Sequence, residues 1–142
     1  MTQNEKDLLL KDLCTRLPYG VIVNVKGFDF DFKDKLTQIY KNGYGCSIQV
    51  TNNMPYGIEQ VKPYLFPLSS MTEEQKNELI EMEWSFDNST ICNILECFGT
   101  YRAYVDHSCC SELIDWLIKN HFDYRGLIPM GLAIDAAGKN IY

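Results

Sequence analysis

One short segment gathers most of the side chains that could do chemistry. His121, Asp123, Tyr124 and Arg125 place an imidazole, a carboxylate, a phenol and a guanidinium within five residues. Histidine titrates near neutral pH and arginine grips carboxylates or phosphates, so the segment could supply an acid or base and hold an anion. The same residue types also cap helix ends and fix loops. Because no recognised catalytic spacing surrounds them, we favour a structural anchor over a small hydrolase or ligand-binding site.

A second group of residues combines cysteine with histidine. Cys92 and Cys97, followed by His107, Cys109 and Cys110, suggest zinc, because thiolate and imidazole are its usual ligands. Structural zinc sites pair ligands two to four residues apart on turns, a spacing that this group lacks. A cysteine hydrolase would need nucleophile and base correctly placed, which sequence neighbours rarely achieve. We therefore expect no metal and no cofactor.

Other polar motifs have structural interpretations. Asp29, Asp31 and Asp34 alternate like calcium ligands, but the glycine and distal glutamate of a calcium loop are missing, which favours the solvent-exposed face of a strand. Ser70–Glu73 and Thr72–Gln75 overlap as two capping boxes, in which side chains satisfy the free amides of a helix start. These residues predict the beginning of a helix.

The elements that would position these residues follow from local patterns. Thr2 and Glu5 form a further capping box, and the helix after it should continue to Arg16 and end before Pro18. Its apolar residues predict which side is buried. That predicted face consists of Leu10, Leu13, Cys14 and Leu17.

Alternating apolar residues from Val21 onward predict strands. Two strands, at 21–26 and 28–33, join at Lys26-Gly27, and a second pair, at 35–41 and 44–51, flanks Asn42-Gly43, a preferred hairpin turn. These four strands suggest an antiparallel meander. Residues 62–68 are extended, and Pro63 and Pro67 restrict them to an edge strand or an irregular segment.

The second half of the chain favours helices. We expect a helix at 72–83 and a strand at 101–105. The pattern of residues 88–98 is ambiguous, although its apolar residues have helical spacing and Gly99 could end a helix there. A last helix, capped by Ser108, should bury one face and leave Trp116 outside it. His121 either points inward or ends that helix. The predicted buried face comprises Cys110, Leu113, Ile114, Leu117 and Ile118.

Composition limits the classes of function. The chain has 142 residues, 46% of them apolar, with a net charge of −6, so an acidic globular protein is expected and direct nucleic-acid binding is disfavoured. No run of residues has the length and hydropathy of a membrane span, and the charged start does not resemble a signal peptide. We therefore predict a cytoplasmic protein whose six cysteines are reduced thiols.

Three stretches carry a resemblance to known proteins. They are LPYGV at 17–21, KPYLFPLSSMTEEQ at 62–75 and DWLIKNHFDYRGLIPMGLAIDA at 115–136. In these stretches the chain resembles small uncharacterised proteins of gut Bacteroidetes and their phages and mobile elements, a family without an established activity. The chain departs from that family at its end, where it has Asp-Ala-Ala-Gly-Lys-Asn-Ile-Tyr instead of an acidic-Ala-Pro-Gly-Met-Tyr-like tail.

Together these patterns predict one domain, residues 1–142, of the α+β class. An antiparallel sheet of about four to six strands should pack with three or four helices. For function we expect a non-enzymatic accessory protein of a phage or mobile element that binds a host or phage protein, for example as an acidic inhibitor of a factor that handles nucleic acids. Trp116 and Trp84 are the candidate binding residues, because aromatic side chains commonly anchor interfaces. The sequence leaves the oligomeric state open.

Overall fold

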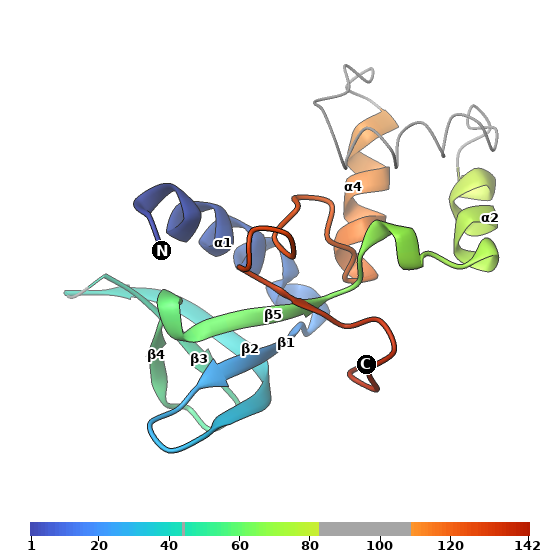
Figure 1. Ribbon diagram of the computed structural model, residues 1–142. Coiled ribbons are helices and arrows are strands. Elements are labelled where there is room, and N and C mark those ends of the chain that lie inside the picture. Colours follow the sequence, from blue (N-terminus) through green and yellow to red (C-terminus); the bar gives the residue numbers. More distant parts are fainter. Residues whose placement is uncertain (44, 83–108) are drawn as a thin grey trace.

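Helices gather at two places around a sheet of short strands (Figure 1). The computed structural model describes residues 1–43, 45–82 and 109–142. Its elements, in chain order, are α1 (Gln3–Arg16), the 3-10 helix η1 (Leu17–Tyr19), β1 (Ile22–Lys26), β2 (Asp31–Asn42), β3 (Gly45–Val50), β4 (Pro55–Gly57), η2 (Ile58–Gln60), β5 (Val61–Leu65), η3 (Leu68–Ser70), α2 (Glu73–Met82), α4 (Cys109–Lys119) and β6 (Ile134–Asp135).

The sheet has six strands in the order β4-β3-β2-β1-β5-β6. All neighbours are antiparallel except β5 and β6, which are parallel. Three α-helices accompany the sheet in the described part of the chain, so the predicted α+β class with a mostly antiparallel sheet is confirmed. The predicted hairpin turn is also present, because β2 ends at Asn42 and β3 begins at Gly45.

The predicted strands at 28–33 and 35–41 form one strand, β2, which is 12 residues long. Its first residues, Asp31 to Lys35, pair with β1, and the rest pairs with β3. The register shifts between Leu36 and Gln38, where the strand passes from one partner to the other. A bulge of this kind bends a strand and explains how a single strand serves two neighbours.

The edge position predicted for the strand around Pro63 is only partly right. In β5, Val61, Lys62 and Pro63 pair with β1, while β6 adds to the other side at Tyr64 and Leu65. β6 comes from the far end of the chain, and no local pattern could reveal that partner. Proline is compatible with this arrangement because β6 joins β5 only after Pro63.

Helix α1 begins at the predicted capping box but buries a different face. The Thr2 hydroxyl accepts from the amide of Glu5, and the Glu5 carboxylate accepts from the amide of Thr2. Leu9, Asp12, Leu13 and Arg16 are buried, whereas Cys14, predicted on the buried face, is exposed. Two charged residues therefore occupy positions that apolar periodicity assigns to hydrophobic residues.

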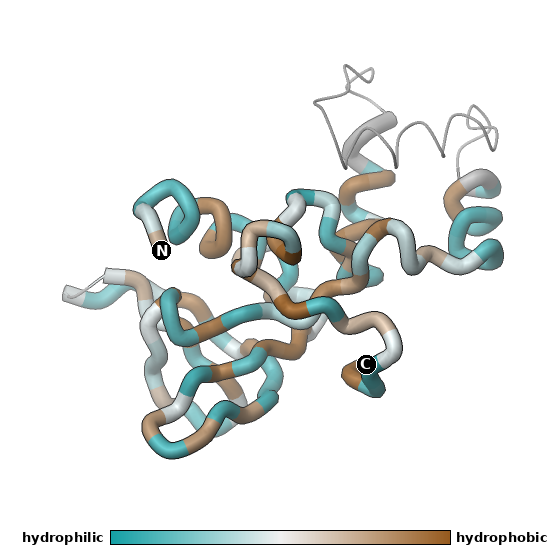
Figure 2. Tube along the Cα trace, viewed as in Figure 1, coloured by the Kyte–Doolittle hydropathy of each residue, from teal (hydrophilic) through white to brown (hydrophobic). Residues whose placement is uncertain are grey.

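Two hydrophobic cores fill the interior. Hydrophobic residues, brown in Figure 2, recur along the strands and helix α4. The first core lies between the sheet, α1 and the C-terminal segment, and the second core joins α2, α4 and the residues after α4. The first core contains Leu9, Leu13, Val21, Val23, Val25, Leu36, Ile48, Val50, Val61, Leu65, Leu127, Leu132 and Ala133. The second contains Met71, Leu79, Leu113, Trp116, Leu117, Ile118, Phe122 and Tyr124.

Of the two overlapping capping boxes before α2, the second one forms. The amide of Gln75 donates to the Thr72 hydroxyl, and the amide of Thr72 donates to the Gln75 side chain. Ser70 instead donates its hydroxyl to the carbonyl of Pro67. The ambiguous segment 88–98, the strand predicted at 101–105 and the Ser108 cap lie outside the described residues. Within the described ranges, no helix is long and apolar enough to cross a bilayer.

Candidate functional site

His121 ends helix α4 and also points into the protein. It adopts left-handed backbone geometry, with φ of 60°. Its amide donates to the Ile118 carbonyl at 3.1 Å, and the amide of Phe122 donates to the Leu117 carbonyl at 2.9 Å. This pair of bonds is the Schellman motif, in which the left-handed position usually belongs to glycine. The sequence allowed His121 to point inward or to end the helix, and it does both.

Asp123 fixes the backbone that follows. Its two carboxylate oxygens accept from the amides of Leu127 and Ile128, at 2.8 and 2.7 Å. Its own amide donates to the carbonyl of Phe66, just after β5, at 2.8 Å, and the amide of Phe66 donates back to the carbonyl of His121 at 2.9 Å. The segment is therefore held to the end of β5 by main-chain bonds and is closed on itself by Asp123.

Two charged residues of α1 meet this segment inside the protein. Arg16 donates from Nε and Nη2 to the Asp12 carboxylate, at 2.7 and 3.2 Å. The same guanidinium donates to the carbonyls of Ile118 and Phe122, at 3.4 and 2.8 Å. Both Asp12 and Arg16 have fully buried side chains. Arg16 thus ties α1, which belongs to the first core, to the end of α4, which belongs to the second.

Arg125 completes this group. Its Nε lies 3.2 Å from Asp12 Oδ1, and its guanidinium stands over the ring of Tyr124, 4.6 Å from the centroid. Burial raises the pKa of Tyr124. Asp12, Arg16, Asp123 and Arg125 are called here the polar junction, because they join the two cores through charged side chains.

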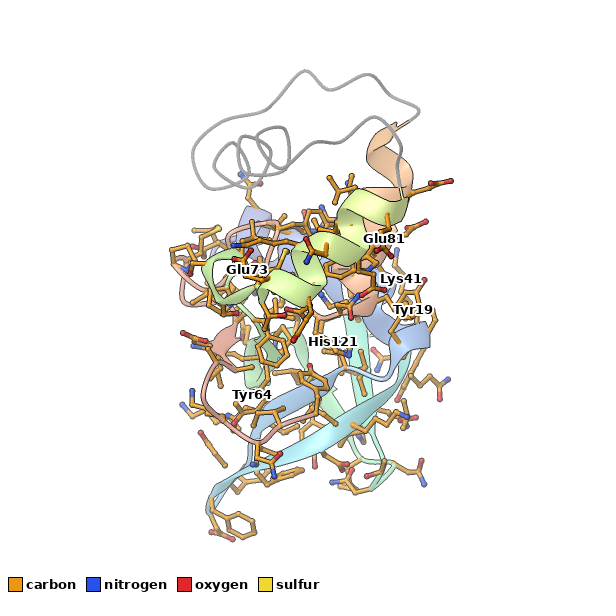
Figure 3. The ribbon with its side chains drawn as sticks, turned by 90° about the vertical axis from the view of Figure 1, so that its right-hand side faces the viewer. Tyr19, Lys41, Tyr64, Glu73, Glu81 and His121 are labelled. Carbon is orange, nitrogen blue, oxygen red and sulfur yellow. The ribbon has the colours of Figure 1, made fainter. Side chains whose placement is uncertain are left out.

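The imidazole of His121 is covered by the last residue of the chain. The rings of His121 and Tyr142 stack with centroids 4.0 Å apart, and the Tyr142 hydroxyl donates to the carbonyl of Tyr64 at 2.7 Å. Burial, with a smaller contribution from Arg16, lowers the pKa of His121 to about 4. Figure 3 shows His121 between α2 and the strands, with Tyr64, a residue of β5, lower in the view. The imidazole is therefore neutral at physiological pH.

These contacts favour the anchor interpretation of residues 121–125. Both oxygens of Asp123 hold main-chain amides, Arg125 faces Asp12, and His121 is stacked and neutral, so little of this chemistry is left for a substrate. The structure brings Asp12 and Arg16 to the segment, and sequence reasoning missed both. The available signal was their spacing of four residues on the side of α1 that carries Leu9 and Leu13.

The expectation that Trp116 lies at the surface is wrong. Its side chain is buried and stacks on Phe122 with ring centroids 5.7 Å apart. Helix α4 is covered on a wider arc than its apolar stripe, because the chain turns back at His121 and lays Phe122 beside Trp116. Trp84, the other predicted binding residue, lies outside the described residues.

Exposed aromatic side chains gather instead at the loop between β1 and β2. Phe28 is fully exposed, Phe30 is 72% exposed, and Met54 on the neighbouring loop before β4 is 58% exposed. Phe30 contacts Phe32 edge to face at 6.4 Å, and Phe32 contacts Tyr56 in the same way at 6.0 Å. We call Phe28, Phe30, Phe32, Met54 and Tyr56 the aromatic tip.

The aromatic tip surrounds a hollow of about 430 Å³, which Lys26, Pro55 and Gln60 also line. The loop between β1 and β2 lies at the opposite end of the protein from α2 and α4 (Figure 1). The turn is tight, because a Cβ atom on Gly27 would approach the carbonyl oxygen of Phe30 to 2.5 Å. The strand predicted at 28–33 begins only at Asp31, so Phe28 and Phe30 belong to the loop before β2, where both are exposed.

No family model matches the chain, and no curated protein or solved structure is significantly similar to it.

Proposed function

We propose that the protein is a binding module that recognises a partner protein through the aromatic tip. The exposure of Phe28, Phe30 and Met54 on two adjacent loops carries this proposal. Large apolar side chains that gather at a surface are costly in water, and such patches commonly mark interaction sites. Aromatic anchors of this kind often contribute most of the binding energy of an interface.

Two residues of the aromatic tip also connect it to the first core. Phe32 and Tyr56 pack against the first core and hold Phe30 by edge-to-face contacts, and Lys26 lies opposite Asp31 where β1 and β2 meet the loop. A surface already held in its binding shape loses less conformational entropy when a partner binds. This support distinguishes the aromatic tip from a pair of phenylalanines on a mobile loop.

The charge of the chain suggests the kind of partner. A net charge of −6 would speed association with a basic protein and would make that association sensitive to salt. Together with the resemblance to proteins of phages and mobile elements, this charge supports an accessory protein that inhibits a host factor of basic surface. A basic surface is typical of proteins that handle nucleic acids.

A photocrosslinking experiment tests the proposal. Phe28 is replaced by a photoreactive phenylalanine analogue, and the protein is irradiated in the cells that naturally produce it. Tyr19, which is 42% exposed and lies away from the aromatic tip, serves as the matched control position. We expect one protein to crosslink from position 28 and not from position 19.

The purified partner then allows a quantitative test. The double variant Phe28→Ser and Phe30→Ser should weaken binding by about 30-fold or more, which corresponds to about 2 kcal/mol for a pair of anchor residues. Identical crosslinks from positions 28 and 19, or a double variant that binds as tightly as the unchanged protein, would contradict the proposal.

A further inference from the structure

The outward side of three strands carries a concentration of lysine residues. Residues directly opposite one another in neighbouring antiparallel strands share a face, and the face repeats at every second residue. Asn24 of β1 lies opposite Lys33 of β2 and Lys62 of β5. The same face therefore contains Ile22, Asn24, Lys26, Asp31, Lys33, Lys35, Lys62 and Tyr64, which we call the lysine face.

The charge of the lysine face is opposite to that of the whole chain. Four of the 13 basic residues of the chain belong to the lysine face. Of the 19 acidic residues, only Asp31 is among the residues of β1, β2 and β5 that make up this face. Lys26, Lys33 and Lys35 are exposed and Lys62 is half-buried. Among the described residues, no carboxylate lies within 4 Å of any of these four ammonium groups.

The lysine face is continuous with the aromatic tip. A hollow of about 460 Å³ over this face is lined by the ammonium groups of Lys26 and Lys62 and by the carboxylates of Asp31 and Glu59, of which Glu59 pairs with Lys6. Asn24, Gln60 and Ile134 complete the lining. Lys26 and Gln60 line both this hollow and the hollow of the aromatic tip. A ligand that extends from one hollow to the other would therefore meet ammonium groups first and exposed aromatic rings next.

We propose that the lysine face binds single-stranded nucleic acid. Surfaces that bind single strands combine a positively charged path for the phosphates with aromatic side chains on which bases stack. Here Lys33 and Lys35 lie two residues apart on one strand, about 7 Å along its direction. Beyond them Asp31 lies opposite Lys26, and the loop that carries Phe28 and Phe30 follows. Flexible phosphates could contact the lysines in turn while a base stacks on the aromatic tip.

The geometry also indicates that this binding is independent of base sequence. Asn24, at the centre of the face, donates from Nδ2 to Asp31 and accepts from the Tyr64 hydroxyl, both at 3.4 Å. Asn24 is thereby tied to its neighbours on the face, and the charged groups beside it are lysines, which contact phosphates. Phosphate contacts position a strand without reading its sequence. The net charge of −6 disfavours binding by the chain as a whole, but the lysine face is a local exception.

The binding of a fluorescently labelled oligothymidylate of 15 nucleotides, measured by fluorescence anisotropy, tests this proposal. The test variant carries Lys33→Gln and Lys62→Gln, and the matched control carries Lys11→Gln and Lys119→Gln, two exposed lysines on α1 and α4. Both double variants lose the same charge. We expect the test variant to bind at least 10-fold more weakly at 25 mM salt, with the control within 2-fold of the unchanged protein.

The salt dependence gives a second readout. Removal of two phosphate contacts should reduce the slope of log binding constant against log salt concentration by about 1.4. Equal weakening by both variants, equal binding of polyglutamate, tighter binding of duplex DNA, or no binding at 25 mM salt would each overturn the proposal. Both proposals use the aromatic tip, but the lysine substitutions leave its residues unchanged. Crosslinking from position 28 to a protein therefore tests the proposed function, and the lysine variants test the binding of oligothymidylate.

Discussion

The polar junction buries charged side chains that are usually exposed, and the aromatic tip exposes aromatic side chains that are usually buried. In the polar junction, Asp12 and Arg16 are fully buried, while in the aromatic tip Phe28 is fully exposed. Most residues of a folded protein need no special explanation, but a buried charge or an exposed aromatic cluster does. The two regions are therefore the places where the protein departs from the usual arrangement of buried apolar and exposed charged residues.

The departures have different physical explanations. Each charge of the polar junction has a partner within the protein: Asp12 faces two guanidinium groups, and Arg16 also donates to two main-chain carbonyls. Burial of charge is tolerated when such partners replace water. The Phe28 ring, by contrast, remains fully exposed to water. The charges of the polar junction are paired within the protein, whereas the exposed ring of the aromatic tip is what motivates the proposed binding site.

The largest effect should come from breaking the polar junction at Arg16. Arg16→Met would leave the carbonyls of Ile118 and Phe122 without this donor and would remove the bidentate partner of Asp12. Removal of one partner of a buried ion pair costs about 3–5 kcal/mol of stability. Urea unfolding followed by circular dichroism should show a loss of this size.

The exposed ion pair between Lys6 and Glu59 gives the matched control for that experiment. Lys6→Met also breaks an ion pair between a basic residue of α1 and a carboxylate, but the carboxylate, Glu59, is largely exposed. Exposed pairs contribute little because water and salt screen them. A Lys6→Met variant as unstable as Arg16→Met would show that burial is not what makes the polar junction important.

Burial of His121 should make the stability of the protein depend on pH. The pKa of His121 is about 4 in the folded protein and near 6.5 in the unfolded chain, so between these values only the unfolded chain takes up the proton. Stability should therefore fall as the pH drops from 6.5 to about 4, by a total of about 3 kcal/mol from this group. Above pH 6.5 the group contributes no pH dependence.

Comparison with His121→Asn isolates this contribution, because asparagine tolerates left-handed backbone geometry but does not titrate in this range. Urea unfolding at pH 7.0, 5.5 and 4.5 should give curves for the two proteins that differ most at neutral pH and converge on acidification. If the difference stays constant with pH, the imidazole is not buried in its neutral form.

Arg125→Ala should have a smaller effect than Arg16→Met. Asp12 would keep its bidentate contact to Arg16, and Arg125 is 18% exposed in the intact protein. The loss of its contact to Asp12 and of its packing on Tyr124 should lower stability by about 1–3 kcal/mol. Thermal unfolding measures this change, and an unchanged melting temperature would mean that Arg125 is free for another role.

The sequence predicted the parts of the fold that depend on neighbours in the chain. The Thr2 cap of α1, the Thr72 cap of α2 and the turn after Asn42 all formed as expected, because each depends on a few adjacent residues. The Asp12–Arg16 pair was missed because charged residues weaken the apolar period of a buried face. The contact of Arg16 with Phe122 spans 106 residues, and no local pattern encodes it.

The candidate sites likewise combine features that the local sequence predicts with features that depend on distant parts of the chain. Residues 121–125 stood out in the sequence as a cluster, but their role became visible only when α1 and β5 were placed beside them. The exposure of Phe28 depends on where β2 begins, which alternation alone did not fix. Trp116 was misplaced because Phe122 reaches back to it across the end of α4.

The smallest effect on stability should come from the aromatic tip, and this prediction sharpens the comparison most. Phe28→Ser removes a ring that is fully exposed, so folding gains almost nothing from it, and the melting temperature should shift by less than about 2 °C. Phe32→Ser is the control, because Phe32 packs against the first core and contacts both Phe30 and Tyr56, and its loss should lower the melting temperature clearly. The premise of the proposed binding site is that folding gains nothing from this ring. If Phe28→Ser unfolds as early as Phe32→Ser, then Phe28 supports the fold and that premise fails.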